Sequence, residues 1–252
     1  MTVTLEARGL TKNCDGVAIV DDVDLVAEAG RITVIIGPNG AGKTTLFNCI
    51  SGTDRPERGT VWHRGDDVTG APPDALARRG LVRTFQQSSV FPTMTVAENL
   101  LTAAENHRRA STMRGLLGLP DPGARRAFAL VQRTLGDLGL SALADVRSAV
   151  LSSGTLRLVE LARALCCEPD TLLLDEPASG LDDGETDALH ALLRRLAARQ
   201  LALVMIEHDL ALVHDAADVV YVLASGRVVT SGAPSDVLSR NDVRSLLVGR
   251  AP

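Results

Sequence analysis

Short, largely apolar runs alternate along the chain with stretches in which apolar residues recur every three or four positions. Four of these runs are 31–36 (RITVII), 171–174 (TLLL), 201–206 (LALVMI) and 219–223 (VVYVL). Runs without regular polar alternation are typical of strands buried on both faces of a parallel sheet. Helices are predicted between them, one beginning near Thr95, where Thr95 and Glu98 have capping-box spacing, and another from Gly184 to Arg199. The pattern predicts an α/β fold in which helices cover a mostly parallel sheet.

Residues 91–148 depart from this alternation. Strand signals disappear there and apolar residues recur at helical spacing, which predicts a helical subdomain inserted between elements of the sheet. Within it, residues 107–126 contain five arginines and one acid. This basic segment is either a solvated loop or a surface that contacts lipid headgroups or a partner.

Composition narrows the class of protein. The chain has 252 residues, 31 acidic and 26 basic side chains and a formal net charge of -5, and its length suits one large domain. The acidic balance and the six aromatic residues argue against broad nucleic-acid binding or base stacking. The four cysteines lack disulfide or metal-ligand spacing, which favours a reducing cytoplasm. No apolar run approaches the roughly 18 to 20 residues that a bilayer span requires.

The strongest chemical signal is the segment GPNGAGKTT, which fits the pattern G-x-x-x-x-G-K-[ST] between a strand and a helix-like stretch. Its members are Gly37, Pro38, Asn39, Gly40, Ala41, Gly42, Lys43, Thr44 and Thr45. In such a loop, backbone N–H groups converge on phosphate oxygens, the lysine reaches the terminal phosphates and a hydroxyl serves Mg²⁺. Lys12 and Lys43 are the only lysines in the chain, which argues that the lysine at position 43 has a specific role and is not merely one of many surface charges. A glycine-rich turn without a ligand is the alternative.

Two further segments carry candidate chemistry. Asp175 and Glu176 follow the predicted strand 171–174, where the first acid is placed to hold Mg²⁺ through water and the second to polarise an attacking water. Taken alone, this pair is equally consistent with a solvated turn. Ser152, Ser153 and Gly154 form a turn that leads into an amphipathic helix, which suits either an anion site or a simple N-cap. Two anion sites in one chain suggest a head-to-tail pair in which each chain completes the other's site.

The order of these motifs resembles that of the nucleotide-binding subunit of ABC transporters over essentially the whole chain. Residues 37–45 resemble the Walker A loop, Asp175 with Glu176 the Walker B pair, and 151–155 (LSSGT) the signature. Gln86 in RTFQQ resembles the Q-loop glutamine, Asp182 in SGLD the D-loop, and His208 in IEHDL the switch histidine. The resemblance implies an α/β P-loop NTPase of ABC type, with a RecA-like core, an antiparallel β-region and an inserted helical subdomain. It also implies a single ABC ATPase domain over 1–252, with its core at about 1–88 and 159–252 and the helical subdomain at about 89–158.

The same resemblance implies an ATPase that uses ATP and Mg²⁺. The implied catalytic residues are Glu176, which orients water, and His208 and Gln86, which sense the γ-phosphate. The implied metal ligands, direct or through water, are Thr44, Gln86 and Asp175. Ser152, Ser153 and Gly154 would enclose the ATP of a second chain, and Asp182 would belong to the D-loop.

Two further sequence segments resemble one branch of this family. Residues 83–101 (RTFQQSSVFPTMTVAENLL) and 242–249 (DVRSLLVG) resemble the ATPase subunits of branched-chain amino acid importers. The implied cargo is branched-chain amino acids or a related small polar solute. The implied partners are transmembrane permease subunits, a second ABC ATPase subunit that is identical or paralogous, and an extracytoplasmic solute-binding protein, with no nucleic acid. The implied location is the cytoplasmic face of the cell membrane, as a peripheral subunit.

Two other functions stay open. One is a soluble ABC-type ATPase that acts on ribosomes or DNA, a class that usually carries paired cassettes, long coiled coils or zinc-binding cysteines, whereas this sequence has one cassette and no CxxC. The other is a regulatory ATP-binding subunit with little hydrolysis. Two departures from the family pattern favour it: Cys14 stands where an aromatic residue usually stacks on adenine, and Thr155 stands where glutamine usually follows the signature glycine.

Overall fold

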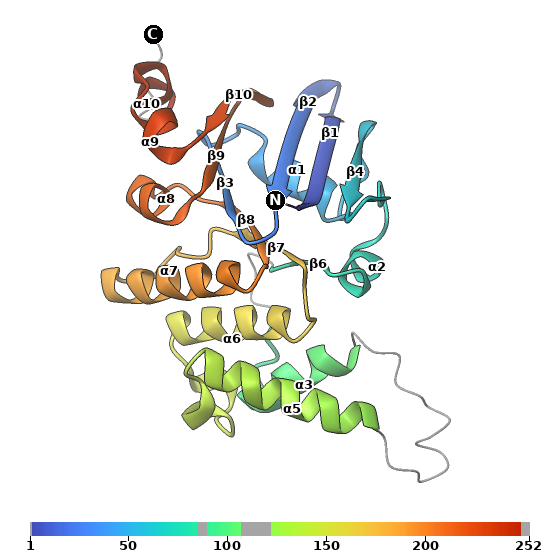
Figure 1. Ribbon diagram of the computed structural model, residues 1–252, viewed down its shortest axis with the longest axis vertical. Coiled ribbons are helices and arrows are strands. Elements are labelled where there is room, and N and C mark those ends of the chain that lie inside the picture. The colour runs from blue at the N-terminus through green and yellow to red at the C-terminus, as the bar shows by residue number, and fades with distance from the viewer. Residues whose placement is uncertain (1, 85–89, 107–121, 248–252) are drawn as a thin grey trace.

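A computed structural model describes residues 2–84, 90–106 and 122–247 of the chain. It contains two β-sheets, of which the larger lies near the centre with helices around it (Figure 1). A stack of helices lies at one end of the molecule, and the smaller, antiparallel sheet lies towards the other end. Among the described residues, no helix combines the length and the apolar character that a membrane span requires.

The larger sheet has six strands in the order β10-β9-β3-β8-β7-β6. Their bounds are β3 (Ile32–Ile36), β6 (Leu81–Arg83), β7 (Thr171–Asp175), β8 (Ala202–Ile206), β9 (Val219–Ala224) and β10 (Arg227–Gly232). Strand β10 runs antiparallel to β9, and the other neighbouring pairs are parallel. The four predicted strands are confirmed as β3, β7, β8 and β9, each with one end shifted by a single residue.

The smaller sheet is antiparallel and has the order β2-β1-β4-β5. Its strands are β1 (Val3–Cys14), β2 (Val17–Glu28), β4 (Arg58–His63) and β5 (Asp66–Asp67). A hydrogen bond from the backbone N–H of Val26 to the Tyr221 hydroxyl, at 3.2 Å, ties this sheet to β9. The α/β fold with an antiparallel β-region, expected from the family resemblance, is therefore confirmed.

The helices are α1 (Lys43–Ile50), α2 (Pro73–Arg78), α3 (Val96–Asn106), α5 (Pro122–Asp137), α6 (Ser153–Leu165), α7 (Asp183–Ala198), α8 (Leu210–Ala216), α9 (Pro234–Leu238) and α10 (Asn241–Leu247). Short 3₁₀ turns span Ser141–Leu143 and Ser148–Val150. The predicted capping box of α3 is present: the Thr95 hydroxyl accepts from the Glu98 N–H at 3.2 Å, and the Glu98 carboxylate accepts from the Thr95 N–H at 2.8 Å. The helix predicted from Gly184 to Arg199 is α7, one residue earlier at each end.

The central sheet separates two hydrophobic cores. The first lies between the sheet and the helices α3, α5, α6, α7 and α8, and residues such as Val34 and Leu172 enter it. The second lies between the sheet, the antiparallel sheet and α1, and Ile35 and Leu173 enter it from alternate positions of the same strands. This burial on both faces explains why the sequence of these strands is apolar without alternation.

The described part of 91–148 contains helices, 3₁₀ turns and an isolated bridge between Thr95 and Arg147, but no strand of the sheets. In Figure 1, α3 and α5 lie side by side beyond α6, on the far side of α6 from the central sheet. Most of the basic segment at 107–126 lies outside the described residues, which resume at the start of α5.

Candidate active site

Several candidate residues lie at one edge of the six-stranded sheet. Strands β3, β7 and β8 run parallel, so their carboxyl ends meet at that edge. Strand β3 leads into the loop 37–42, β7 ends at Asp175, and β8 is followed by Glu207 and His208. Strand β6 pairs with β7 and ends at Arg83, whereas Gln86, three residues further on, lies outside the described residues.

The loop from 37 to 42 closes directly onto the N-terminus of α1. Gly42 precedes the helix with φ 98°, a left-handed conformation, and a Cβ there would lie 2.3 Å from the carbonyl oxygen of Ile19. Only glycine fits both constraints. Thr44 and Thr45 lie in the first turn of α1, with Thr44 exposed. The glycine-rich loop thus leads directly into a helix N-terminus, an arrangement that can bind phosphate through backbone N–H groups.

The Lys43 side chain folds back over this loop. Its Nζ donates to the carbonyl oxygens of Gly37 at 2.7 Å and Pro38 at 3.0 Å. Burial lowers the pKa of Lys43, while the nearby carboxylates of Glu176 and Asp175 oppose that shift. Lys43 thus interacts electrostatically with both acids, although they are more than 130 positions away in the sequence.

The two acids after β7 have different environments. The Asp175 side chain is 1% exposed; its Oδ2 accepts from Arg83, and its buried Oδ1 has no hydrogen-bond partner among the described residues. Glu176 is half-buried and adopts φ 47°, a left-handed conformation that costs a non-glycine residue roughly 1 to 2 kcal/mol. Its backbone N–H donates to Ile206 at 3.0 Å, which holds this turn against the end of β8. Such local strain is typical of functional positions.

Glu207 supports the segment that carries His208. The buried Glu207 carboxylate accepts from the backbone N–H groups of Ala178 and His208, both at 3.2 Å, and so joins the turn after β7 to the turn after β8. Burial raises the pKa of Glu207, an effect that these backbone donors oppose. The His208 side chain is exposed at the same edge.

The serine-rich turn and Asp182 cap two successive helices. Ser152 is the N-cap of α6, where its hydroxyl accepts from the Thr155 N–H at 3.2 Å. Ser153 begins the helix and is exposed. Asp182 is the N-cap of α7 and forms a capping box with Glu185. Among the described residues, no hydrogen bond joins either cap to the loop 37–45.

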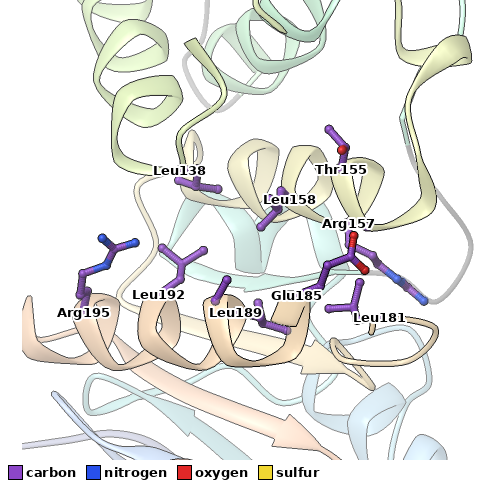
Figure 2. Close-up of a pocket in the computed structure, with 11 residues that line it drawn as sticks. Leu138, Thr155, Arg157, Leu158, Leu181, Glu185, Leu189, Leu192 and Arg195 are labelled. Atoms are coloured by element: carbon purple, nitrogen blue, oxygen red, sulfur yellow. The ribbon is translucent and has the colours of Figure 1, made fainter. Parts of the chain in front are cut away.

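A cleft of about 200 Å³ lies between α6 and α7 (Figure 2). Five of its 11 lining residues are leucines, with Leu158 on α6 facing Leu189 and Leu192 on α7. At one end of the cleft, the Glu185 carboxylate lies so close to Gly154 that a Cβ there would be 2.3 Å from Oε1. The small size of Gly154 therefore lets the start of α6 approach the capping carboxylate of α7.

Three residues of this region were not singled out from the sequence: Arg83, Glu185 and Glu207. A signal existed for Glu185, since Asp182 and Glu185 have capping-box spacing. Glu207 is an acid directly before the candidate histidine, at the end of a predicted strand. Arg83 carries no such signal, because its partners come from distant parts of the chain.

Comparison with known protein families shows the family to which the chain belongs. Residues 20–179, more than half of the chain, match the family described as ABC transporter. The chain belongs to the ABC transporter family. It is accordingly an ABC-type ATPase with ATP as substrate, and it serves as a subunit of a membrane transporter.

The chain resembles members of the ABC family along nearly its full length. It is 36% identical over 250 residues to BraF of Pseudomonas aeruginosa and to LivG of Escherichia coli, each described as a high-affinity branched-chain amino acid transport ATP-binding protein, with 98% of both chains covered. A solved ATP-binding cassette of an ABC transporter in its ADP conformation superposes with a TM-score of 0.86 at 31% identity, covering 99% of this chain and 100% of the other. A nucleotide-free cassette gives 0.84 at 31% identity, with 97% and 98% covered.

Proposed function

We propose that this ATPase powers the import of branched-chain amino acids, or of a related small polar solute. The proposal is supported by the full-length similarity to BraF and LivG. Its partners would be transmembrane permease subunits, a second ABC ATPase subunit that is identical or paralogous, and an extracytoplasmic solute-binding protein. The chain would lie at the cytoplasmic face of the membrane as a peripheral subunit, and residues 89–158 would form the helical subdomain, with α6 continuing from it into the core.

The observation that carries the catalytic part of the proposal is the convergence of Lys43, Asp175 and Glu176 at one sheet edge. Backbone N–H groups of 37–45 would bind the phosphates of ATP, with the Lys43 ammonium released from the loop carbonyls to the terminal phosphates. Glu176 would orient the water that attacks the γ-phosphate, and His208 and Gln86 would contact that phosphate.

The residues present fit Mg²⁺. Oδ1 of Asp175 is buried and without a partner among the described residues, and the Thr44 hydroxyl is exposed in the first turn of α1. Thr44, Asp175 and Gln86 would hold the ion, directly or through water. When bound, Mg²⁺ neutralises charge on the phosphate oxygens. The described residues contain no cluster of three His, Cys, Asp or Glu side chains that could hold a metal, which suits an ion that keeps several waters and binds substrate phosphates.

The remaining candidate residues would act in a second chain. Ser152, Ser153 and Gly154 lie at the N-terminus of α6, and the absence of any hydrogen bond to 37–45 among the described residues suits a role towards another chain's ATP. Asp182, which caps α7, would lie at the same contact between the two chains.

Turnover in the assembled transporter tests the catalytic assignment. Glu176→Gln should keep ATP binding and lower ATP hydrolysis by about a hundredfold or more, because the group that polarises water is lost. Lys43→Ala should lose nucleotide binding as well. Glu105→Gln, on the exposed face of α3, is the matched control and should hydrolyse ATP at the parental rate. Parental turnover by Glu176→Gln would contradict the assignment.

Uptake in proteoliposomes tests the cargo. The complex with its permease and binding protein should accumulate labelled leucine, isoleucine or valine in an ATP-dependent manner, and Glu176→Gln should abolish that uptake. ATP-dependent uptake of a different small polar solute, with none of the branched-chain amino acids, would replace the cargo and keep the importer. Export of the solute would contradict the proposed direction.

A further inference from the structure

Arg83 forms a buried ion pair with Asp175, the acid at the end of β7. The side chains are 8% and 1% exposed, and Nη2 of Arg83 lies 2.9 Å from Oδ2 of Asp175. The ion pair between Arg199 and Asp137, by contrast, has both side chains partly exposed at the surface. A buried arginine beside an acid at the site is therefore a distinct feature of this edge of the sheet.

The same guanidinium also contacts α1, the helix that begins at Lys43. Its Nη1 donates to Oδ1 of Asn48 at 2.7 Å and to Oγ of Ser51 at 3.1 Å, and the group lies 5.6 Å from the centre of the Phe47 ring. A guanidinium is planar and presents its donors in a fixed fork, so several simultaneous bonds restrict its orientation. The contacts with α1 thus restrict the orientation of Arg83, and Arg83 in turn holds the carboxylate of Asp175 at the end of β7.

The two carboxylate oxygens of Asp175 have different environments. Oδ2 is taken by Arg83, whereas Oδ1 is buried and has no partner among the described residues. Groups that hydrogen-bond to a metal-ligating side chain orient it and tune its affinity for the metal. Arg83 is also the last residue of β6, so it lies where α1, β6 and β7 meet.

We propose that Arg83 is a positioning residue for the divalent cation: it holds Asp175 with Oδ1 directed to the ion and links that acid to α1. This inference rests on the proposed function, because it takes Asp175 as a ligand of Mg²⁺. It assigns to Arg83 a role in metal-dependent nucleotide binding that is separate from the binding of the nucleotide itself.

Calorimetric titration of the purified chain with ADP, in Mg²⁺ and in EDTA, tests the inference. The measured quantity is the ratio of the two affinities. Arg83→Met, which keeps much of the side-chain volume but removes the charge and the fork, should reduce this ratio by about tenfold to a hundredfold. Affinity in EDTA should stay near the parental value, because 37–45 are untouched. Arg199→Met removes an exposed arginine from a surface pair and should leave the ratio unchanged.

A double-mutant cycle shows whether Arg83 acts through Asp175. Asp175→Asn should lower the ratio, and adding Arg83→Met to it should lower the ratio no further. Independent, additive losses would overturn the inference, as would an unchanged ratio in Arg83→Met. If Arg83→Met does not fold, Asn48→Leu tests the same contact: it removes one bond to the guanidinium and should reduce the ratio, and an unchanged ratio there would equally overturn the inference.

The outcomes separate this inference from the function on which it rests. A parental chain that binds ADP without any effect of Mg²⁺, or binds no nucleotide, would contradict the proposed metal site or the proposed nucleotide site. A parental chain with strong Mg²⁺ dependence that Arg83→Met retains would contradict only the role of Arg83. If the ion pair were purely structural, Arg83→Met would lower thermal stability and leave the ratio of the two ADP affinities unchanged.

Discussion

Gly154→Ala probes the contact between the start of α6 and the capping carboxylate of α7. The new Cβ would lie 2.3 Å from Oε1 of Glu185, so the carboxylate must move. Moving it breaks the bond that it accepts from the Asp182 N–H at 3.2 Å, a loss of about 1 kcal/mol. Alanine in a helix is more favourable than glycine by about 0.5 kcal/mol at the lower end of its range. We therefore expect Gly154→Ala to lower the free energy of unfolding by about 0.5 kcal/mol from these two terms.

The effect of Gly154→Ala on the free energy of unfolding should change sign when the Glu185 side chain is removed. In a Glu185→Ala background the clash is absent, and Gly154→Ala should raise the free energy of unfolding by about 0.5 kcal/mol. The difference between the backgrounds, about 1 kcal/mol, corresponds to about 2 to 4 °C in Tm for a chain of this size. Thermal melts of the four variants measure it, and equal shifts of Tm in both backgrounds would refute the reasoning. Gly136→Ala is the control: a Cβ there meets nothing within 4 Å, so its effect should not depend on Glu185.

Three further substitutions test other parts of the molecule. Cys14→Tyr supplies a ring where the family usually stacks adenine, so competition binding should show tighter ATP binding, by about 1 kcal/mol or more, and a wider gap to GTP; an unchanged ratio would show that position 14 does not contact the base. Phe91 is 43% exposed, with the Arg163 guanidinium 5.0 Å from its ring centre, and we expect this exposed ring to pack against the permease; Phe91→Asp should therefore detach the subunit from membranes that carry its permease, and an unchanged membrane-bound fraction would contradict this expectation. Burial lowers the pKa of His63 in the folded chain, so on acidification the unfolded state takes up the proton first and stability falls below about pH 6.5. His63→Gln should flatten that decline in a series of melts from pH 7 to roughly pH 5, and a decline as steep as the parental one would refute this assignment.

The central strands were predictable because burial on both faces leaves a simple pattern. Strands β3, β7, β8 and β9 are short and nearly continuous in apolar residues. The long strands β1 and β2 were not located from their pattern. Register irregularities interrupt their pairing at several points, including between Ala7 and Leu10, so polar and apolar positions do not alternate regularly along them.

The site was predictable where its residues are contiguous in the sequence. The loop 37–45 and the pair Asp175 and Glu176 are local strings whose chemistry can be read directly. The contact of Arg83 with Asp175 joins residues 92 positions apart and depends on the pairing of β6 with β7. Gly154 was noted as part of a flexible turn, but its close approach to Glu185 depends on how α6 lies against α7. Such contacts arise only from tertiary packing.

The separation of the interior into two cores affects how chains of this kind can diverge. Helices α3, α5 and α6 pack in one core, whereas α1 and the antiparallel sheet pack in the other, with the central sheet between them. Helix residues on opposite sides of that sheet belong to different cores, so we expect the effects of their substitutions on stability to be close to additive. After a gene duplication, the helical face could change to suit a new membrane partner while the packing beneath the phosphate loop stayed the same. One ancestral ATPase could in this way give rise to many subunits that share their chemistry and differ in the complex they join.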